Sequence, residues 1–215
     1  MNAIVQELKG LLKTKSIGTD SDRALLLDFQ AALETQPEKA IKLEKNALAQ
    51  IENITADNAR LVSNLHANLG GLYRMNGYPD LAREHMEKSI SLLDQFNLLH
   101  INDSIPQIAN YAMFLTEQQE PERGISELQK LSGIIKEYHS DECLDYAKVQ
   151  ETLATIYLMT ANLSHAKTHF KKAFKIYEKI WADEPEMIEA KYREIQELYP
   201  QIGFSIGKTL SGLLT

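Results

Sequence analysis

The sequence predicts an all-α protein, a solenoid of about four stacked helix–turn–helix units. The first observation is a series of small residues spaced 42 residues apart, at Ala40, Ala82, Gly124 and Ala166. Prolines keep the same spacing at Pro37, Pro79 and Pro121, and a second series in phase comprises Asp28, Gly70, Ala112 and Ala154. Small residues at a fixed period mark close helix crossings, and a period of roughly 20 to 50 residues is typical of solenoids.

The repeats follow one another between two caps. The first repeat has Asp28 and Glu44 where the other repeats carry small or apolar residues. This is expected of an end unit, because one of its faces lies in water. The predicted division comprises an N-terminal capping helix (1–19), four repeats (20–55, 56–102, 103–140 and 141–182), a C-terminal capping helix (183–200) and an apolar, glycine-containing tail (201–215).

The second repeat has the clearest helices. Its first helix is predicted to begin near Asp57 and to bury one stripe, comprising Val62, Leu65, Leu69, Leu72 and Tyr73. Asn76-Gly77 supplies a turn. Pro79 then opens the second helix at a position where its missing N–H does no harm. The buried stripe of this second helix is predicted to comprise Leu81, Ala82, Met86, Ser89, Leu92 and Leu93.

The later elements repeat this plan. The third and fourth repeats carry Tyr111 and Tyr157 in their first helices and Leu128 and Phe170 in their second. The segment after them has a single apolar seam, formed by Ile188, Tyr192, Ile195 and Tyr199. A helix with one such seam suits a cap that covers the last repeat on one side only.

Charge and cysteine content narrow the functional class. The chain carries 23 basic and 30 acidic residues, a net charge of −7, which argues against a nucleic-acid binder. Cys143 is the single cysteine, which favours a reducing compartment. The N-terminal apolar residues are interrupted by Glu7 and Lys9, unlike a secretory signal, and no segment has the roughly 18 apolar residues of a membrane span. We expect a cytoplasmic protein that contacts no membrane.

Two strings, LGGLYRMNGYPDLAREHMEKSI and LATIYLMTANLSHAKTHFKKAF, resemble tetratricopeptide repeats. The 42-residue spacing is longer than the roughly 34 residues common in that family. It resembles the kinesin light chain subclass and the bacterial peptide-pheromone receptors. The resemblance covers about residues 20–182 and implies a right-handed α-solenoid whose concave groove binds a peptide or an extended protein segment.

The resemblance also indicates groove residues. Asn68 and Asn110 lie 42 residues apart and match positions where asparagines of the kinesin light chain type bind a peptide backbone. An amide offers both a donor and an acceptor for this purpose. The alternative is that each asparagine bonds a neighbouring helix or water. The full set of groove candidates is Asn64, Asn68, Arg74, Asn110, Met113, Glu117, Lys148, Glu151 and Thr155.

Catalytic and cofactor chemistry is weakly represented. His165 and His169 have the spacing of a helical metal pair but lack a third ligand. Gly207-Lys208-Thr209 lacks the strand and the first glycine of a phosphate-binding loop. We therefore expect no enzyme, no cofactor and no metal.

We expect an adaptor or scaffold for protein partners. The alternative is a peptide-responsive sensor of a bacterial type without its own DNA-binding domain. For the tail of residues 201–215, we favour packing within the chain. A homodimer contact through the tail remains an open alternative.

Overall fold

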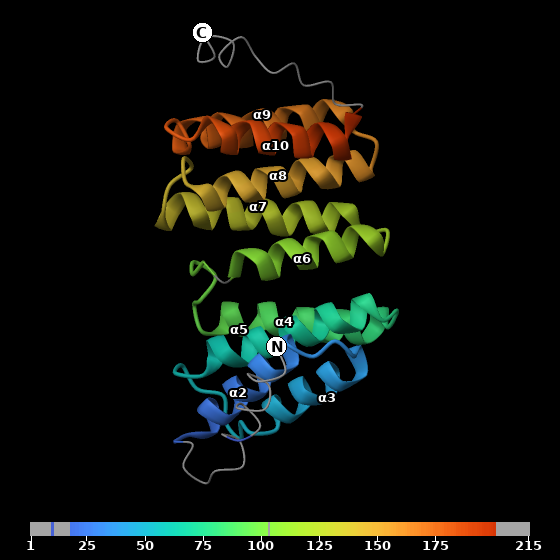
Figure 1. Cartoon of the computed structure of the whole chain (residues 1–215), viewed down its shortest axis with the longest axis vertical. Helices are drawn as coiled ribbons and strands as arrows, with labels where there is room; N and C mark the ends of the chain where they lie inside the picture. Colours follow the sequence, from blue (N-terminus) through green and yellow to red (C-terminus); the bar gives the residue numbers. More distant parts are fainter. Residues whose placement is uncertain (1–9, 11–17, 103, 201–215) are drawn as a thin grey trace. The chain divides into compact units, whose positions relative to one another are not determined.

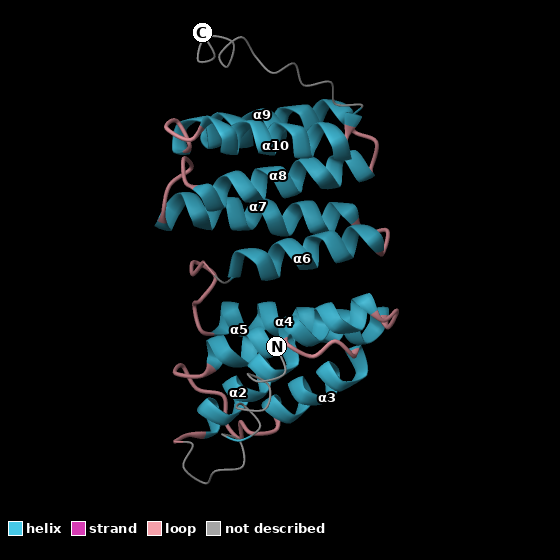
Figure 2. Ribbon diagram, in the orientation of Figure 1, coloured by secondary structure: helices cyan, strands magenta, loops and turns pink. Residues whose placement is uncertain are grey.

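The structure is a computed structural model that describes residues 10, 18–102 and 104–200. These residues form nine helices and no strand (Figures 1 and 2). The helices are α2 (Asp20–Ala32), α3 (Pro37–Leu48), α4 (Ala59–Met75), α5 (Pro79–Gln95), α6 (Ser104–Glu117), α7 (Pro121–Tyr138), α8 (Leu144–Met159), α9 (Leu163–Ile180) and α10 (Pro185–Leu198). None of the described helices is long and apolar enough to cross a membrane.

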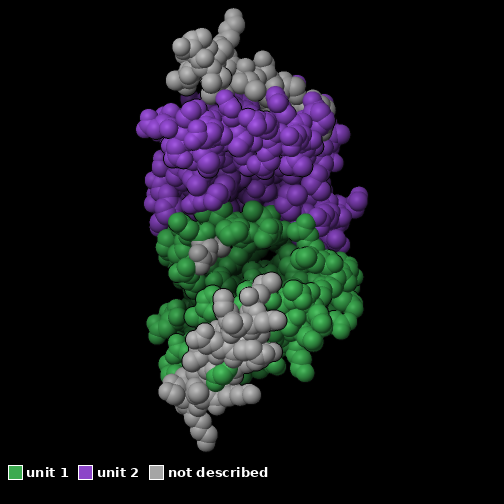
Figure 3. All heavy atoms as spheres, in the orientation of Figure 1, with its two compact units in different colours: residues 1–111 green, residues 112–215 purple. Residues whose placement is uncertain are grey.

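Consecutive helices pack in pairs. The helices α2 and α3, α4 and α5, and α8 and α9 lie against one another, and α3–α4 and α7–α8 contacts join successive pairs. The chain divides into two compact units, residues 1–111 and 112–215, with the boundary inside α6 (Figure 3). The predicted division into four repeats and two caps stays a prediction, and its segments 1–9, 11–17 and 201–215 lie outside the described residues.

The first helix of a pair ends in the same backbone turn every 42 residues. The backbone φ is positive at Gly77 (75°), Gln119 (66°) and Ala161 (59°). The next N–H bonds the carbonyl five residues back, with Tyr78 to Tyr73 at 3.0 Å, Glu120 to Leu115 at 2.8 Å and Asn162 to Tyr157 at 2.7 Å. This Schellman arrangement satisfies the helix-end carbonyls. The second helix then begins at once, and α3, α5 and α7 open on a proline as predicted.

Close helix crossings explain the small residues of the repeat. A Cβ added at Gly124 in α7 would lie 2.6 Å from the backbone oxygen of Ala112 in α6. A Cβ added at Gly70 in α4 would lie 2.6 Å from Cγ of Met86 and 3.3 Å from the oxygen of Ala82 in α5. Because real contacts are never so short, the crossing at Gly124 requires a residue without a side chain, whereas at Gly70 the closest atom belongs to the side chain of Met86.

The buried stripes agree with the predicted ones at most positions. In α4 and α5, Val62, Leu65, Leu69, Tyr73, Ala82, Met86, Ser89, Leu92 and Leu93 are buried. Leu81 is 39% exposed, so its predicted place in the stripe was wrong. Ala82 occupies the centre of the crossing at this turn, and the adjacent residue is rotated about 100° around the helix, toward water. Leu72 is only partly buried, and α4 begins at Ala59 rather than near Asp57.

The last helix covers its neighbour through aromatic contacts. Ile188, Tyr192 and Ile195 of α10 are buried. The ring of Tyr192 stacks on Phe174 of α9 at 4.0 Å between centroids, and Tyr199 lies 6.1 Å from Phe170. The apolar seam read from the sequence is therefore the face that α10 presents to α9.

We expect Gly124→Ala to lower the free energy of unfolding by about 1–3 kcal/mol, since the added methyl group meets the backbone rather than a movable side chain. The matched control is Gly133→Ala in the same helix, where a Cβ meets nothing within 4 Å. The control should gain about 0.5–1 kcal/mol from the better helix propensity of alanine. Urea denaturation measures both variants, and equal effects would contradict the crossing.

Candidate functional site

A groove in the first unit lies between α4 and α6, with α5 as its floor. Its volume is about 200 Å³. It is lined by Ala67, Gly71, Arg74 and Met75 of α4, Met86 and Ser89 of α5, and Gln107 and Asn110 of α6. The α4 residues recur at three- to four-residue intervals, so they form one face of that helix. Arg74 and Asn110, both predicted groove residues, line this groove.

The groove combines an open wall with one apolar contact surface. Gly71 presents no side chain, and a Cβ there would meet no atom within 4 Å. Met75 is 85% exposed, the most exposed of the large apolar side chains described. Asn110 is exposed, and no described group forms a hydrogen bond with its amide. A ligand backbone can therefore approach α4 closely while its polar groups reach an amide on α6.

Gln107 holds the α6 wall in place. Its Oε1 accepts hydrogen bonds from the hydroxyls of Ser63 (2.8 Å) and Ser89 (2.6 Å), both of which are buried. Its Nε2 donates to Oδ1 of Asn64 at 2.5 Å. Asn64, predicted to face a ligand, therefore lies in a network that links α6 to α4 and α5.

The sequence reading missed Gln107. The signal that could have found it is the pair of serines on otherwise apolar stripes, because buried hydroxyls require polar partners.

Asn68 is not equivalent to Asn110. Its Nδ2 donates to Oδ1 of Asp28 at 2.8 Å and to Oε1 of Glu44 at 3.3 Å. The residue that corresponds to Asp28 in the next repeat is Gly70, so Asn110 has no equivalent carboxyl group to bond. Asn68 does not line this groove, and its place in a ligand groove stays a prediction, because two carboxyl groups of the preceding helices accept hydrogen bonds from its amide.

Glu44 is a buried carboxyl group. It is 2% exposed, and its Oε2 has no hydrogen-bond partner among the described residues. Burial raises its pKa to about 9, and the negative charge of Asp28 adds to the effect. Glu44 therefore carries a proton at neutral pH. Glu44 occupies the repeat position that the buried Met86 occupies 42 residues later. A buried position of this kind favours an uncharged side chain, which the protonated Glu44 provides.

The other five predicted groove residues lie in the second unit, and two of them bond one another. Glu151 of α8 accepts from the hydroxyl of Tyr177 in α9 at 2.6 Å and pairs with Lys191 of α10 at 2.7 Å. Thr155 donates its hydroxyl to the carbonyl of Glu151 at 3.0 Å. Burial, followed by the Glu151 charge, raises the pKa of Tyr177. Glu151 thus joins α8 to α9 and α10.

The remaining three predicted residues form no common site. Lys148 is exposed and lies 3.7 Å from Asp145 on its own helix. Met113 is half-buried and Glu117 is exposed, both on α6. None of these three lines the groove between α4 and α6.

The histidine pair is packed onto an aromatic ring. His165 and His169 stack on Tyr157, with ring centroids 4.9 and 5.3 Å away. The Nδ1 of His165 lies 2.9 Å from Oδ1 of Asn162, and that of His169 lies 2.8 Å from Oε1 of Gln150. His169 is half-buried, and burial lowers its pKa to about 4. Within residues 18–102 and 104–200, no three side chains converge as metal ligands.

The repeats match a known family model. Residues 104–179 match the model of the tetratricopeptide repeat. A comparison with curated protein sequences found no significant match.

Solved structures show the same fold. BtubC (BKLC) from P. vanneervenii is 19% identical with a TM-score of 0.68, over 83% of this chain and 71% of that one. The putative kinesin light chain repeats of Podosopora anserina are 16% identical with a TM-score of 0.67, over 83% and 90%. MamA is 14% identical with a TM-score of 0.57, over 83% and 89%.

These findings confirm two expectations. Residues 104–179 match the tetratricopeptide repeat, and the fold is an all-α, helical-repeat solenoid like that of the solved kinesin light chain repeats. Repeats of this class serve as scaffolds for protein–protein interaction, and the fold is typically non-catalytic.

We expect stability to fall as pH rises through the titration of Glu44. The pKa of this carboxyl group is about 9 in the folded chain against 4.5 as its ordinary value, so unfolding releases a proton between these limits. The stabilising contribution is complete below pH 4.5 and is lost progressively toward pH 9, by about 1.4 kcal/mol per pH unit at most. Glu44→Gln should remove this slope in urea denaturation.

Glu38→Gln is the matched control, because Glu38 is an exposed carboxyl group on the same helix. The control should keep the slope of the native chain. A slope unchanged in Glu44→Gln would contradict a buried, protonated Glu44.

Proposed function

We propose that this protein is a protein-interaction scaffold that binds an extended segment of a partner in the groove between α4 and α6. The observation that supports the proposal most is the pairing of Gly71 with Asn110 across the groove. Gly71 leaves the backbone of α4 accessible, and Asn110 offers an exposed amide on α6. The single cysteine supports a place in a reducing compartment. No catalytic role is assigned to any residue.

Each groove residue has a definite use for a peptide ligand. The amide of Asn110 can donate to a peptide carbonyl and accept from a peptide N–H at once. Arg74 supplies a planar set of N–H donors suited to carbonyl or carboxylate oxygens. Met75 offers a flexible apolar surface that adapts to different side chains. The groove therefore recognises backbone with polar groups and side chains with apolar ones.

The size of the groove favours a peptide over a small-molecule substrate. Its volume of about 200 Å³ is below the roughly 300–1,000 Å³ of pockets that enclose small ligands. A volume of this size admits one anchoring side chain. The rest of a partner segment then lies along the exposed residues of α4 and α6.

The test is a substitution that fills the groove without disturbing the fold. Peptides are selected from a random phage-displayed library on the native protein and titrated by calorimetry. We expect Gly71→Leu to abolish their binding while the chain stays folded, since no described atom lies within 4 Å of the new Cβ. Ser126→Leu is the control in α7, because Ser126 is exposed and does not line this groove, and it should bind these peptides as the native protein does.

The two asparagines provide a finer comparison. Asn110→Ala should weaken peptide binding by about 0.5–1.5 kcal/mol, the contribution of a hydrogen bond. Asn68→Ala should lower stability instead, because Asn68 bonds Asp28 and Glu44. Selected peptides that bind Gly71→Leu with native affinity would exclude the α4–α6 groove as the binding site.

A further inference from the structure

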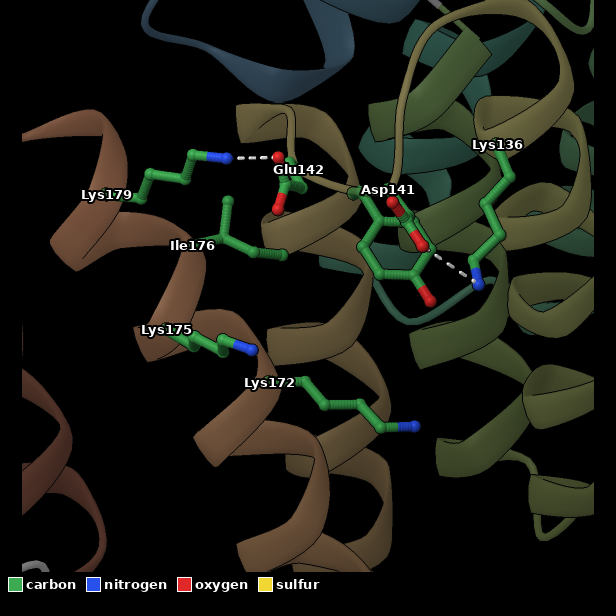
Figure 4. A pocket seen from close by; sticks show the side chains of 8 residues that line it. Lys136, Asp141, Glu142, Lys172, Lys175, Ile176 and Lys179 are labelled. Atoms are coloured by element: carbon green, nitrogen blue, oxygen red, sulfur yellow. Dashed lines mark hydrogen bonds and ion pairs between the residues drawn. The ribbon is translucent and has the colours of Figure 1, made fainter.

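A second hollow surface lies in the second unit, between α7 and α9. It consists of two adjoining cavities of about 300 and 340 Å³, which share Lys136, Tyr146 and Lys172. The helix α8 lies beneath it with Gln150 and Leu153 (Figure 4 shows the end with the lysines). The α4–α6 groove is walled by first helices of their pairs, whereas this one is walled by second helices. We call it the α7–α9 groove.

Lysines dominate one end of the α7–α9 groove. Lys172, Lys175 and Lys179 project from successive turns of α9, and Lys136 faces them from α7 (Figure 4). The acidic lining residues of this end are Asp141 and Glu142 alone. This local excess of positive charge stands out in a chain whose net charge is −7.

Two carboxylates of the segment that connects α7 to α8 already bind lysines of this groove. Asp141 pairs with Lys136 of one wall at 3.3 Å, and Glu142 pairs with Lys179 of the other wall. The hydrogen bond to Asp141 raises the pKa of Lys136. Two consecutive acidic residues of a non-helical segment therefore reach opposite walls of the groove. Lys172 and Lys175 have no ion-pair partner among the described residues.

We propose that the α7–α9 groove binds an acidic, extended segment of another protein, whose carboxylates pair with Lys172 and Lys175. Lys172 and Lys179 are about 10 Å apart along the α9 axis, at 1.5 Å per residue. An extended chain covers that distance in about three residues, and its alternating side chains point toward the two walls in turn. A partner segment with an acidic residue at every second position therefore presents its carboxylates to the α9 wall, where Lys172 and Lys175 lie.

The lining favours carboxylates over nucleic acid. It contains no arginine, the residue best suited to bidentate phosphate contacts. Of its two aromatic rings, Tyr146 is buried and lies 5.3 Å beneath the ammonium of Lys136, and the half-buried imidazole of His169 stacks on Tyr157, so neither is an exposed surface for base stacking. Three lysines over two turns of α9, with Lys136 of α7 facing them, match a short acidic peptide rather than a polyanion.

The test uses a fluorescein-labelled ten-residue peptide of alternating aspartate and serine, titrated with the full chain by fluorescence anisotropy. An asparagine–serine peptide is the uncharged control and should not bind. We expect the double variant Lys172→Glu, Lys175→Glu to weaken binding by about tenfold or more. The matched variant Lys167→Glu, Lys171→Glu changes the charge of α9 equally outside the groove and should weaken binding far less.

Three further variants separate binding in the α7–α9 groove from diffuse charge attraction and from binding in the α4–α6 groove. Gly133→Leu narrows the α7–α9 groove without changing charge, since Gly133 lines it and a Cβ there meets nothing within 4 Å, and it should weaken binding severalfold. The double variant Asp141→Asn, Glu142→Gln frees Lys136 and Lys179 and should strengthen binding severalfold. Gly71→Leu should leave binding of the aspartate–serine peptide unchanged. This result would show that the peptide does not bind in the α4–α6 groove.

Several results would overturn the proposal. They are absence of binding of the aspartate peptide to the native chain, equal losses in the two lysine double variants, or native affinity in Gly133→Leu. Binding of a single-stranded RNA or of phosphatidylserine vesicles that depends on Lys172 and Lys175, without binding of the aspartate peptide, would assign the lysines to another class of partner and would equally overturn it.

Discussion

The close approach of two helices within a pair is the constraint on which the rest of the structure depends. At Gly124 the crossing leaves no room for a methyl group against the backbone of Ala112, and at Gly70 it leaves none against Met86. Such contact buries the apolar stripes of both helices, which neither could bury alone. The start of α6 and the helix α4 form the two walls of one groove.

The fold was largely predictable because its information is local and repeated. The 42-residue spacing located the crossings, and the prolines located the starts of second helices. The positive φ values at Gln119 and Ala161 were not predictable, since neither residue prefers that conformation. They follow from the position in the repeat rather than from residue type. The exposure of Leu81 was also missed, because two adjacent apolar residues at a helix start compete for one buried place.

The candidate site was less predictable because its hydrogen bonds join residues far apart in sequence. Repeat phase placed Arg74 and Asn110 on the α4–α6 groove, but it treated Asn68 as the twin of Asn110. The difference arises from the preceding repeat, where Asp28 stands in place of Gly70 and binds the amide. Likewise Glu151 matched a groove position by phase, yet Lys191 of α10 forms an ion pair with it. The first and last helices depart from the repeat pattern. The repeat spacing alone therefore cannot show which of their side chains bond a predicted groove residue.

The central claim is that partners bind between α4 and α6, and methyl-selective NMR tests it most directly without any substitution. In protein labelled with ¹³C at the methionine methyl groups, Met75 and Met86 report on the groove, whereas Met159 and Met187, exposed on α8 and α10, report elsewhere. On titration with a peptide selected against the native protein, we expect the Met75 and Met86 signals to shift and those of Met159 and Met187 to stay in place. Bound peptide that shifts only Met159 or Met187 would contradict it.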